Sequence, residues 1–320
     1  MGRYILFDNQ ENYDFLISDF DKAFYSPKCQ NKIISWITGA FNVLIHSKRK
    51  DTIVCWFDFQ AIIVYYLSFL FGKRKIVCIN LLLKPKSSIK NTIVTILYKR
   101  ALSSKYFHAT VTAPKYGDLL NKKFGKIFHY TLLRDVYHSY YENATVCHQT
   151  ISKSIFCGGR NGRDWEFLLN LAEKMIDYSF YFVVPAEIYD RHKSNIPQNV
   201  HFSVDVPYNI FMDIMLQSQI VLMPLDTEAP AGLIVLFQTI ANQKPFIVSR
   251  TATTESYIFN NEDFFIPNDL SKWEEKIHEI TECYDIYCEK VLKLRASLEK
   301  NCNEMVFKKK IQDLINEKNY

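Results

Sequence analysis

The stretch "AGLIVLFQTIANQKPFIVS", which runs from Ala231 to Ser249, decides how the second half of the chain folds. It begins with two small residues, continues with apolar residues at helical spacing, breaks at Asn-Gln-Lys-Pro and ends in a β-branched strand. A glycine at the start of a helix that leads directly into a buried strand has two explanations. It belongs either to an ordinary α/β packing unit or to a helix N-terminus that binds a phosphate.

The same alternation of strands and helices extends over most of the chain. In the first half we predict strands at 4–7, 52–57, 75–80 and 108–113, and helices at about 28–46, 59–71, 88–103 and 114–123. In the second half we predict strands at 154–159, 179–184, 200–204, 220–224 and 245–249, and helices at 165–176, 207–217 and 232–242. This alternation predicts an α/β protein with parallel sheets covered by helices on both faces.

Two doubly wound domains are expected, because 320 residues exceed the usual size of a single hydrophobic core. We predict an N-terminal domain over 1–145, a linker over 146–153 where the alternation is lost, a second domain over 154–270 and C-terminal helices over 271–320. The N-terminus lacks an apolar segment of the secretory type, and the longest apolar run, 59–71, is shorter than the ~20 residues that cross a bilayer. These features predict a cytoplasmic protein.

The eight cysteines are scattered, without a CxxC pair or a cluster at ligand spacing, so we expect no metal site. The first 150 residues carry 21 Lys and Arg against 10 Asp and Glu, a net charge of +11, whereas the remainder carries −6. Basic clusters at 48–50, 73–75, 84–86, 99–100 and 122–123 predict a positive potential over the first domain. They are either solvated loop ends or a surface for an anionic membrane. No nucleic-acid-binding motif is present, so we expect no nucleic-acid partner.

The segment "FCGGRNGRDW", residues 156–165, ends a predicted strand and begins a predicted helix. Its glycines let the backbone approach a ligand closely, and Asp164 is suited to cap the helix. Arg160 and Arg163 are expected beyond the carboxyl end of the strand, where open α/β sheets bind ligands and where paired arginines hold a diphosphate. The alternative is a glycine-rich turn with two solvated arginines.

The small residues of the opening stretch complete this predicted site. The backbone N–H groups of Gly232, Leu233 and Ile234 are expected to be unpaired at a helix start, where the helix dipole attracts an anion. Gly158 and Gly159 follow a strand of the same domain, so both loops are expected to meet one ligand. If they do, the phosphate explanation of the opening stretch is the correct one.

Residues 154–270 resemble the GT-B glycosyltransferases, in particular the retaining group that uses nucleotide sugars to build bacterial polysaccharides such as capsule and lipopolysaccharide. The resemblance lies in "GGRNGRDW" at 158–165, "VPYNIFMDIMLQSQIVLMPL" at 206–225 and "AGLIVLFQTIANQKPFIVSRTATTESYI" at 231–258. In that group the last segment reads like G-x-x-x-L-E-A-M-A-x-G-x-P-V-I, and its Glu binds the ribose of the nucleotide.

This sequence departs from the family pattern at three positions. Gln238 stands at the position of the ribose-binding Glu. Pro230 stands where the family has an acidic residue, with Glu228 nearby as a candidate substitute. A basic residue after the loop arginine is missing, and Arg163 is its candidate replacement.

The resemblance implies two Rossmann-like domains that face each other across a cleft. It also implies metal-independent, hexosyltransferase-like transfer from a nucleotide-diphosphate sugar, a co-substrate rather than a cofactor, to a glycan or lipid-linked acceptor. The first domain would bind the acceptor, with Asp58 as the polar group, or as the base if the reaction inverts configuration. Alternatively, Asp58 is the N-cap of helix 59–71.

Two other functions stay open at this point. One is a sugar-nucleotide epimerase of the same fold, and the other is a non-catalytic subunit that binds sugar nucleotide or glycan. The basic first domain further predicts reversible, salt-sensitive binding to an anionic membrane on the cytoplasmic face.

Overall fold

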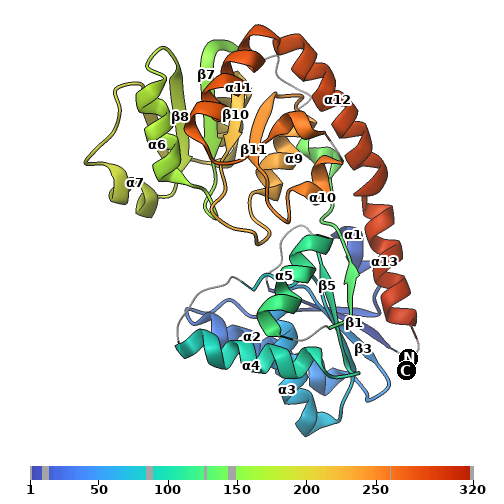
Figure 1. Ribbon diagram of the computed structural model, residues 1–320. Coiled ribbons are helices and arrows are strands. Elements are labelled where there is room, and N and C mark those ends of the chain that lie inside the picture. Colours follow the sequence, from blue (N-terminus) through green and yellow to red (C-terminus); the bar gives the residue numbers. More distant parts are fainter. Residues whose placement is uncertain are drawn as a thin grey trace. The chain divides into compact units, whose positions relative to one another are not determined.

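The structure is a computed structural model that describes residues 2–8, 14–83, 89–125, 128–142, 149–259 and 261–317. The basic cluster at 84–86 and part of the predicted linker, 146–148, lie outside these residues. The chain divides into two compact units (Figure 1). Unit 1 comprises Met1–Val136 and Glu304–Tyr320, and unit 2 comprises Tyr137–Asn303.

Unit 1 contains a parallel six-stranded sheet in the order β2-β1-β3-β4-β5-β6. Its strands are β1 (Arg3–Phe7), β2 (Lys22–Tyr25), β3 (Thr52–Cys55), β4 (Lys75–Cys78), β5 (Phe107–Val111) and β6 (Tyr130–Leu132). Its helices are α1 (Asp14–Ile17), α2 (Lys32–His46), α3 (Asp58–Phe71), α4 (Ile89–Leu102), α5 (Pro114–Phe124) and α13 (Glu304–Asn316). Each helix that we predicted in this half is present.

Helix α13 is the last helix of the described chain, yet it belongs to unit 1. Its apolar residues Phe307, Ile311 and Leu314 share a buried cluster with Ile5 of β1 and Val54 of β3. Helix α1, the other helix in this cluster, has only four residues. The sheet face therefore needs α13 as cover, and the segment 271–320 is divided between the two units rather than forming one group.

Unit 2 contains a second parallel sheet, in the order β12-β11-β10-β7-β8-β9. Its strands are β7 (Ile151–Gly158), β8 (Ser179–Val184), β9 (Val200–Val204), β10 (Ser218–Met223), β11 (Phe246–Ser249) and β12 (Phe265–Ile266). Its α-helices are α6 (Trp165–Lys174), α7 (Ala186–His192), α8 (Tyr208–Gln217), α9 (Leu233–Ala241), α10 (Glu255–Ile258), α11 (Leu270–Glu282) and α12 (Tyr284–Asn301). Short 3₁₀ turns are formed by η1 (Ser139–Tyr141) and η2 (Glu262–Phe264).

The strand orders identify both sheets as doubly wound. Unit 2 has the Rossmann order, because β7 is followed by β8 and β9 on one side and by β10, β11 and β12 on the other. In unit 1, β1 is followed by β2 on one side and by the remaining strands on the other, which is the flavodoxin-like order. The predicted α/β class with two Rossmann-like domains is confirmed.

The boundary between the units lies before the predicted linker. Tyr137 and Tyr141 are part of the buried core of unit 2, and Asn242 donates a hydrogen bond of 2.9 Å to the carbonyl oxygen of Tyr141. Glu142 forms an ion pair of 2.8 Å with Arg295 of α12. The residues just before the predicted linker are therefore packed on unit 2. Within the described residues, no helix combines the length and hydropathy needed to cross a membrane.

Candidate functional site

The loops that follow β7 and β10 meet at one edge of the sheet in unit 2. The N–H group of Asp164 donates a hydrogen bond of 3.0 Å to the carbonyl oxygen of Pro224, and that of Asp226 donates one of 3.1 Å to Gly162. β7 and β10 are neighbours at the point where the strand order reverses. Ligands of open α/β sheets bind at this switch point, beyond the carboxyl ends of the strands.

Arg163 is a buried cation at this switch point. Only 5% of the residue is exposed, and burial lowers the pKa of its guanidinium. One nitrogen, Nη1, lies 3.5 Å from the carbonyl oxygen of Asn161, whereas Nε and Nη2 have no hydrogen-bond partner. No carboxylate of the described residues forms an ion pair with it. Cys157 and Asp226 act against the effect of burial on this pKa but do not outweigh it. A buried charge that is incompletely paired is costly, so the geometry is suited to an anion that supplies the missing bonds.

Two glycines make room for this guanidinium. Gly159 and Gly232 adopt positive φ angles of +124° and +74°, which favour glycine over any other residue. A Cβ atom on Gly232 would lie 2.5 Å from Nη1 of Arg163, and one on Gly159 would lie 3.3 Å from Nη2. Gly232 is therefore required by its own backbone and by the side chain that packs against it.

Helix α9 begins beside the same guanidinium. Gly232 is its N-cap residue and contributes no side chain to the cap. Within the described chain, the backbone N–H groups of Leu233 and Ile234 have no hydrogen-bond acceptor, and Ile234 is 62% exposed. Unpaired N–H groups and the positive end of the helix dipole attract an anion. The structure thus brings together the predicted residues Arg163, Gly159, Gly232 and Leu233.

Arg160 and Gly158 lie in the same loop but in different surroundings. The Arg160 side chain is exposed, and the structure shows no ion pair for it among the described residues. Gly158 ends β7, and a Cβ atom there would lie 2.5 Å from the ring of Phe211 in α8. Gly158 is thus needed for the packing of α8 on β7. Of the two arginines, Arg163 is the one that is buried.

Gln238 lies on the buried side of α9. It is 3% exposed, and its Nε2 donates a hydrogen bond of 2.9 Å to the hydroxyl of Tyr208, the first residue of α8. Tyr208 is 61% exposed. The amide at the position of the ribose-binding Glu is thus connected to the surface through Tyr208. This tyrosine lies in the segment 206–225 that carries the resemblance, but it was not predicted as a site residue.

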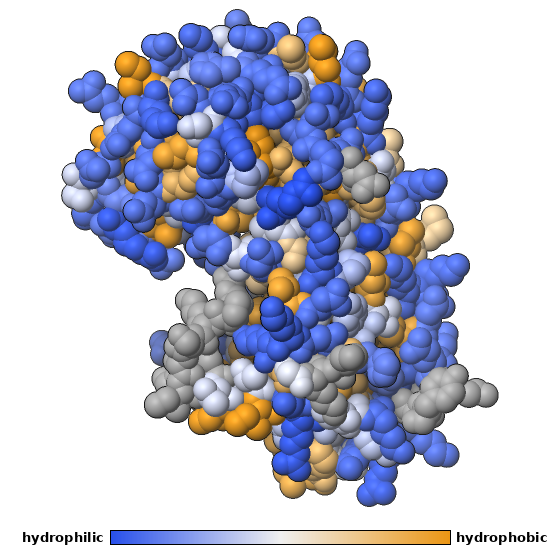
Figure 2. Space-filling model, in the orientation of Figure 1, coloured by the Kyte–Doolittle hydropathy of each residue, from blue (hydrophilic) through white to orange (hydrophobic). Residues whose placement is uncertain are grey.

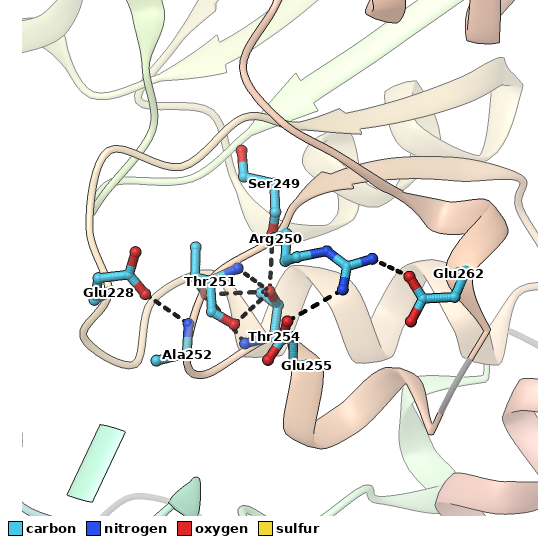
Figure 3. Close-up of polar contacts among 8 residues, drawn as sticks. All are labelled: Glu228, Ser249, Arg250, Thr251, Ala252, Thr254, Glu255 and Glu262. Carbon is cyan, nitrogen blue, oxygen red and sulfur yellow. Dashed lines mark hydrogen bonds and ion pairs between the residues drawn. The ribbon is translucent and has the colours of Figure 1, made fainter. Parts of the chain in front are cut away.

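Glu228 connects the loop after β10 to the loop after β11 (Figure 3). Its carboxylate accepts a hydrogen bond of 2.6 Å from the N–H of Ala252, and its carbonyl oxygen accepts one of 2.9 Å from the hydroxyl of Thr253. In the same loop, Arg250 forms ion pairs with Glu255 and Glu262. One carboxylate oxygen of Glu228 is therefore engaged in positioning the second loop.

Asp58 of unit 1 is buried, with only 1% of the residue exposed. Its two carboxylate oxygens accept hydrogen bonds from the N–H groups of Phe59, at 2.8 Å, and Leu82, at 3.0 Å. Burial raises the pKa of its carboxyl group. These contacts join the start of α3 to the chain that follows β4. Asp58 is the first residue of α3, and Phe57 is the N-cap, so the predicted N-cap role of Asp58 is wrong. Its role on the acceptor side stays a prediction.

Comparison with solved structures identifies the fold. HepE from Anabaena, in complex with UDP and glucose, matches with a TM-score of 0.72 and 9% identity over 99% of this chain and 100% of that chain. The chain has the GT-B fold. Sucrose-phosphate synthase from Thermosynechococcus elongatus matches with a TM-score of 0.70 and 12% identity, over 88% of this chain and 77% of that chain. TarM matches with a TM-score of 0.65 and 12% identity, over 91% of this chain and 59% of that chain.

The GT-B chain thus spans 59% of TarM but nearly all of HepE. No protein-family model matches the sequence, and no curated protein matches it.

The loop after β11 lies within the segment 231–258 that carries the resemblance, but none of its residues was predicted as a site residue. It begins at Arg250, and the Thr254 hydroxyl donates a hydrogen bond of 2.8 Å to the carbonyl oxygen of Ser249 and accepts one of 2.9 Å from the N–H of Thr251. The signal that could have found it is positional, because β11 neighbours β10 and its carboxyl end lies at the same edge of the sheet.

Proposed function

We propose that this protein is a glycosyltransferase that moves a sugar from a nucleotide-diphosphate donor to a glycan or lipid-linked acceptor in cell-surface polysaccharide synthesis. The observation that supports it most is Arg163, a buried guanidinium with two unpartnered nitrogens beside the N-terminus of α9. A diphosphate would offer oxygens to the guanidinium and to the N–H groups of Leu233 and Ile234. The GT-B fold is consistent with this use of the site, and UDP is present in the HepE structure.

The chemistry follows from the charge that develops on the leaving group. Cleavage of the bond between the anomeric carbon and the phosphate oxygen leaves negative charge on the diphosphate. A fixed cation and oriented N–H groups stabilise that charge more strongly in the transition state than in the bound donor. Arg163 and α9 would supply this stabilisation from the protein itself, so we propose that transfer is metal-independent.

The remaining predicted residues have narrower roles in this proposal. Gln238 and Tyr208 would hold the ribose hydroxyls, and Arg160 would close over the diphosphate from the exposed side of the loop. Because Asp58 is buried, we propose that an oxygen of the leaving phosphate accepts the proton of the acceptor hydroxyl. That route corresponds to transfer with retention of configuration.

Turnover of nucleotide sugars tests the proposal. Purified protein is incubated with a panel of UDP and other nucleotide sugars, and release of the nucleoside diphosphate is measured with and without added acceptor. Slow release without acceptor supports a transferase. Stabilisation by a nucleotide sugar without any release would identify the non-catalytic binding subunit instead. Conversion of the sugar to its epimer would identify the epimerase.

Two variants make this measurement specific for the site. Arg163→Met should lose nucleotide release, since one lost donor to a developing oxyanion typically costs 10²–10³ in rate. Arg191→Met is the matched control, because this arginine of α7 has a side chain that is 64% exposed. Equal loss in both variants, or none in either, would contradict the proposed role of Arg163.

A further inference from the structure

Three neighbouring helices of unit 1 carry an unusual number of exposed hydrophobic side chains. We call this region the α2–α4 surface. It consists of Ile33, Ile34, Ile37, Phe41 and Ile45 of α2, Phe69 and Leu70 of α3, and Ile93, Ile96 and Leu97 of α4. Their exposed fractions range from 37% for Leu97 to 80% for Leu70. Figure 2 shows hydrophobic side chains at the lower end of unit 1, where Figure 1 draws α3 and α4.

The three helices pack side by side, so these residues belong to one layer of the unit. Helices α2 and α3 are joined by an edge-to-face contact between Phe41 and Phe71, with ring centroids 5.1 Å apart. Helices α3 and α4 are joined by the hydroxyl of Tyr66, which donates a hydrogen bond of 2.9 Å to the carbonyl oxygen of Leu97. The exposed residues are therefore not scattered singly over the molecule.

Packing on the sheet does not account for them. Helix α2 already buries Gly39, Val43 and Leu44 on its inner side. Its outer side repeats the apolar pattern through Ile37, Phe41 and Ile45, at a spacing of four residues. A helix that is apolar on both sides is normally covered on both sides. An exposed apolar area of this kind marks an interaction surface.

The carboxyl ends of the same helices form a basic rim. Exposed basic residues follow α2, follow α3 and lie at or after the end of α4: Lys48, Arg49, Lys50, Lys73, Lys99, Arg100 and Lys105. The rim is continuous, because Arg49 lies against Gly72 and Lys73 lies over the rings of Phe69 and Tyr106. The segments 32–50, 59–75 and 92–106 contain no Asp or Glu.

The helix dipole explains part of this rim but not the whole surface. Lysines and arginines are favoured near helix C-termini, where they compensate the partial negative charge. That effect gives no reason for ten exposed hydrophobic side chains beside them. A bilayer does give one, because its acyl region accepts the apolar side chains while anionic headgroups attract the basic rim.

We propose that the α2–α4 surface docks on an anionic lipid bilayer, with its exposed isoleucines, leucines and phenylalanines inserted into the headgroup–acyl boundary and its basic rim against the lipid phosphates. A second copy of the chain fits less well, since a two-fold contact through this surface would bring two basic rims together. The docking is independent of the glycosyltransferase proposal, because none of its residues belongs to the switch point in unit 2.

Co-flotation of the full chain with vesicles tests the docking. Vesicles of neutral phosphatidylcholine are compared with vesicles that also contain phosphatidylglycerol, at 0.1 M and 0.5 M NaCl. We expect binding to the anionic vesicles that weakens but does not vanish at the higher salt, because insertion of apolar side chains is not screened. Binding that is absent, or equal on both vesicles, would overturn the proposal.

Two sets of variants separate insertion from attraction. The apolar variant replaces Ile45, Leu70 and Ile96 by Ser, and its control replaces Ile176, Ile286 and Leu292, which are exposed in unit 2, by Ser. The basic variant replaces Lys48, Lys50 and Lys99 by Gln, and its control replaces Lys272, Lys293 and Lys300 by Gln. All twelve side chains are exposed, so each variant is expected to fold.

We expect the basic variant to partition about 100-fold more weakly at 0.1 M salt, given the usual contribution of each lysine near an anionic leaflet. The apolar variant should lose the salt-resistant binding. Both controls should bind like the wild type. An apolar variant that binds like the wild type would overturn the insertion. If the wild type does not bind vesicles but is retained on a support coated with an acidic protein, the α2–α4 surface would be assigned to a protein partner instead.

Discussion

Replacement of Arg163 by Met is expected to stabilise the free protein while weakening its response to nucleotide. Methionine has a similar length and no charge, so the substitution removes a buried cation without opening a large cavity. Two of the guanidinium nitrogens have no partner to lose. Replacing buried charges by apolar side chains of similar volume is neutral or stabilising by about 1–4 kcal/mol. We therefore expect the free energy of unfolding of unit 2 to stay the same or rise by ~1–3 kcal/mol.

The response to UDP should change in the opposite direction. At a concentration 100 times its dissociation constant, UDP stabilises the wild type by about 2.7 kcal/mol. Loss of the charge-assisted hydrogen bonds of Arg163 is expected to cost ~1.5–3 kcal/mol of binding. At the same UDP concentration, the stabilisation of the variant would then fall to ~0.3–1.3 kcal/mol. The free variant is then at least as stable as the wild type, whereas UDP stabilises it less.

Urea unfolding of both proteins, with and without UDP, measures these two quantities together. Titration calorimetry then gives the change in dissociation constant directly. Arg163→Lys is the informative second variant, because it keeps the charge but not the planar fork, and it should bind UDP with intermediate affinity. If Arg163→Met destabilises the free protein by more than 2 kcal/mol and still binds UDP like the wild type, Arg163 has a structural role and the reasoning is wrong.

The remaining predictions concern four other positions. Arg160→Ala should lower both donor affinity and rate, and unchanged binding of a nucleoside diphosphate in calorimetry would exclude its role. Gly232→Ala should weaken UDP binding at least tenfold, because the new methyl group would lie 2.5 Å from Arg163. Gly125→Ala is its control: Gly125 also has a positive φ angle, but open space surrounds it, so this variant should lose only ~1 kcal/mol of stability. Gln238→Ala should raise the Michaelis constant for the donor, and an unaltered constant would show that the ribose lies elsewhere. Burial lowers the pKa of Lys244 from 10.5 to about 8, so between these values the unfolded chain binds more protons and stability rises with pH. Lys244→Met should remove ~1 kcal/mol of that rise between pH 7.5 and 9, as measured by urea unfolding at each pH.

Local patterns in the sequence were sufficient for the elements and the fold class. Strands 179–184 and 200–204 were predicted with the bounds that the structure has, because both are rich in β-branched and aromatic residues, which favour strands. The strands β2, β6 and β12 were missed because they are short and contain no run of β-branched residues, unlike the equally short β3, β4 and β11. The glycines at 159 and 232 could also be recognised from the sequence, since they stand at strand-to-helix turns that need positive φ angles.

The placement of side chains could not be read from the same patterns. Arg160 and Arg163 are two arginines of one loop, and only the packing of the loops after β7 and β10 buries the second and leaves the first exposed. Asp58 was predicted as a polar group for the acceptor or as a helix cap, yet it is buried, with one carboxylate oxygen bonded by Phe59 of α3 and the other by Leu82 of the chain after β4. Burial of a side chain depends on segments far away in the sequence, whereas local spacing reports only which side of its own helix or strand a residue occupies.

The division of the C-terminal helices shows the same limit. The periodicity of 271–320 predicts amphipathic helices but not which core each apolar side covers. Helix α13 joins the sheet of unit 1 because that face has room for Phe307, Ile311 and Leu314, which only the tertiary structure reveals. The sequence alone determined the elements, the α/β class and the two glycine loops, because these depend on local periodicity and backbone conformation. The tertiary structure decided which arginine is buried, which helix covers which sheet and which apolar side chains are left exposed, because these depend on contacts between distant segments.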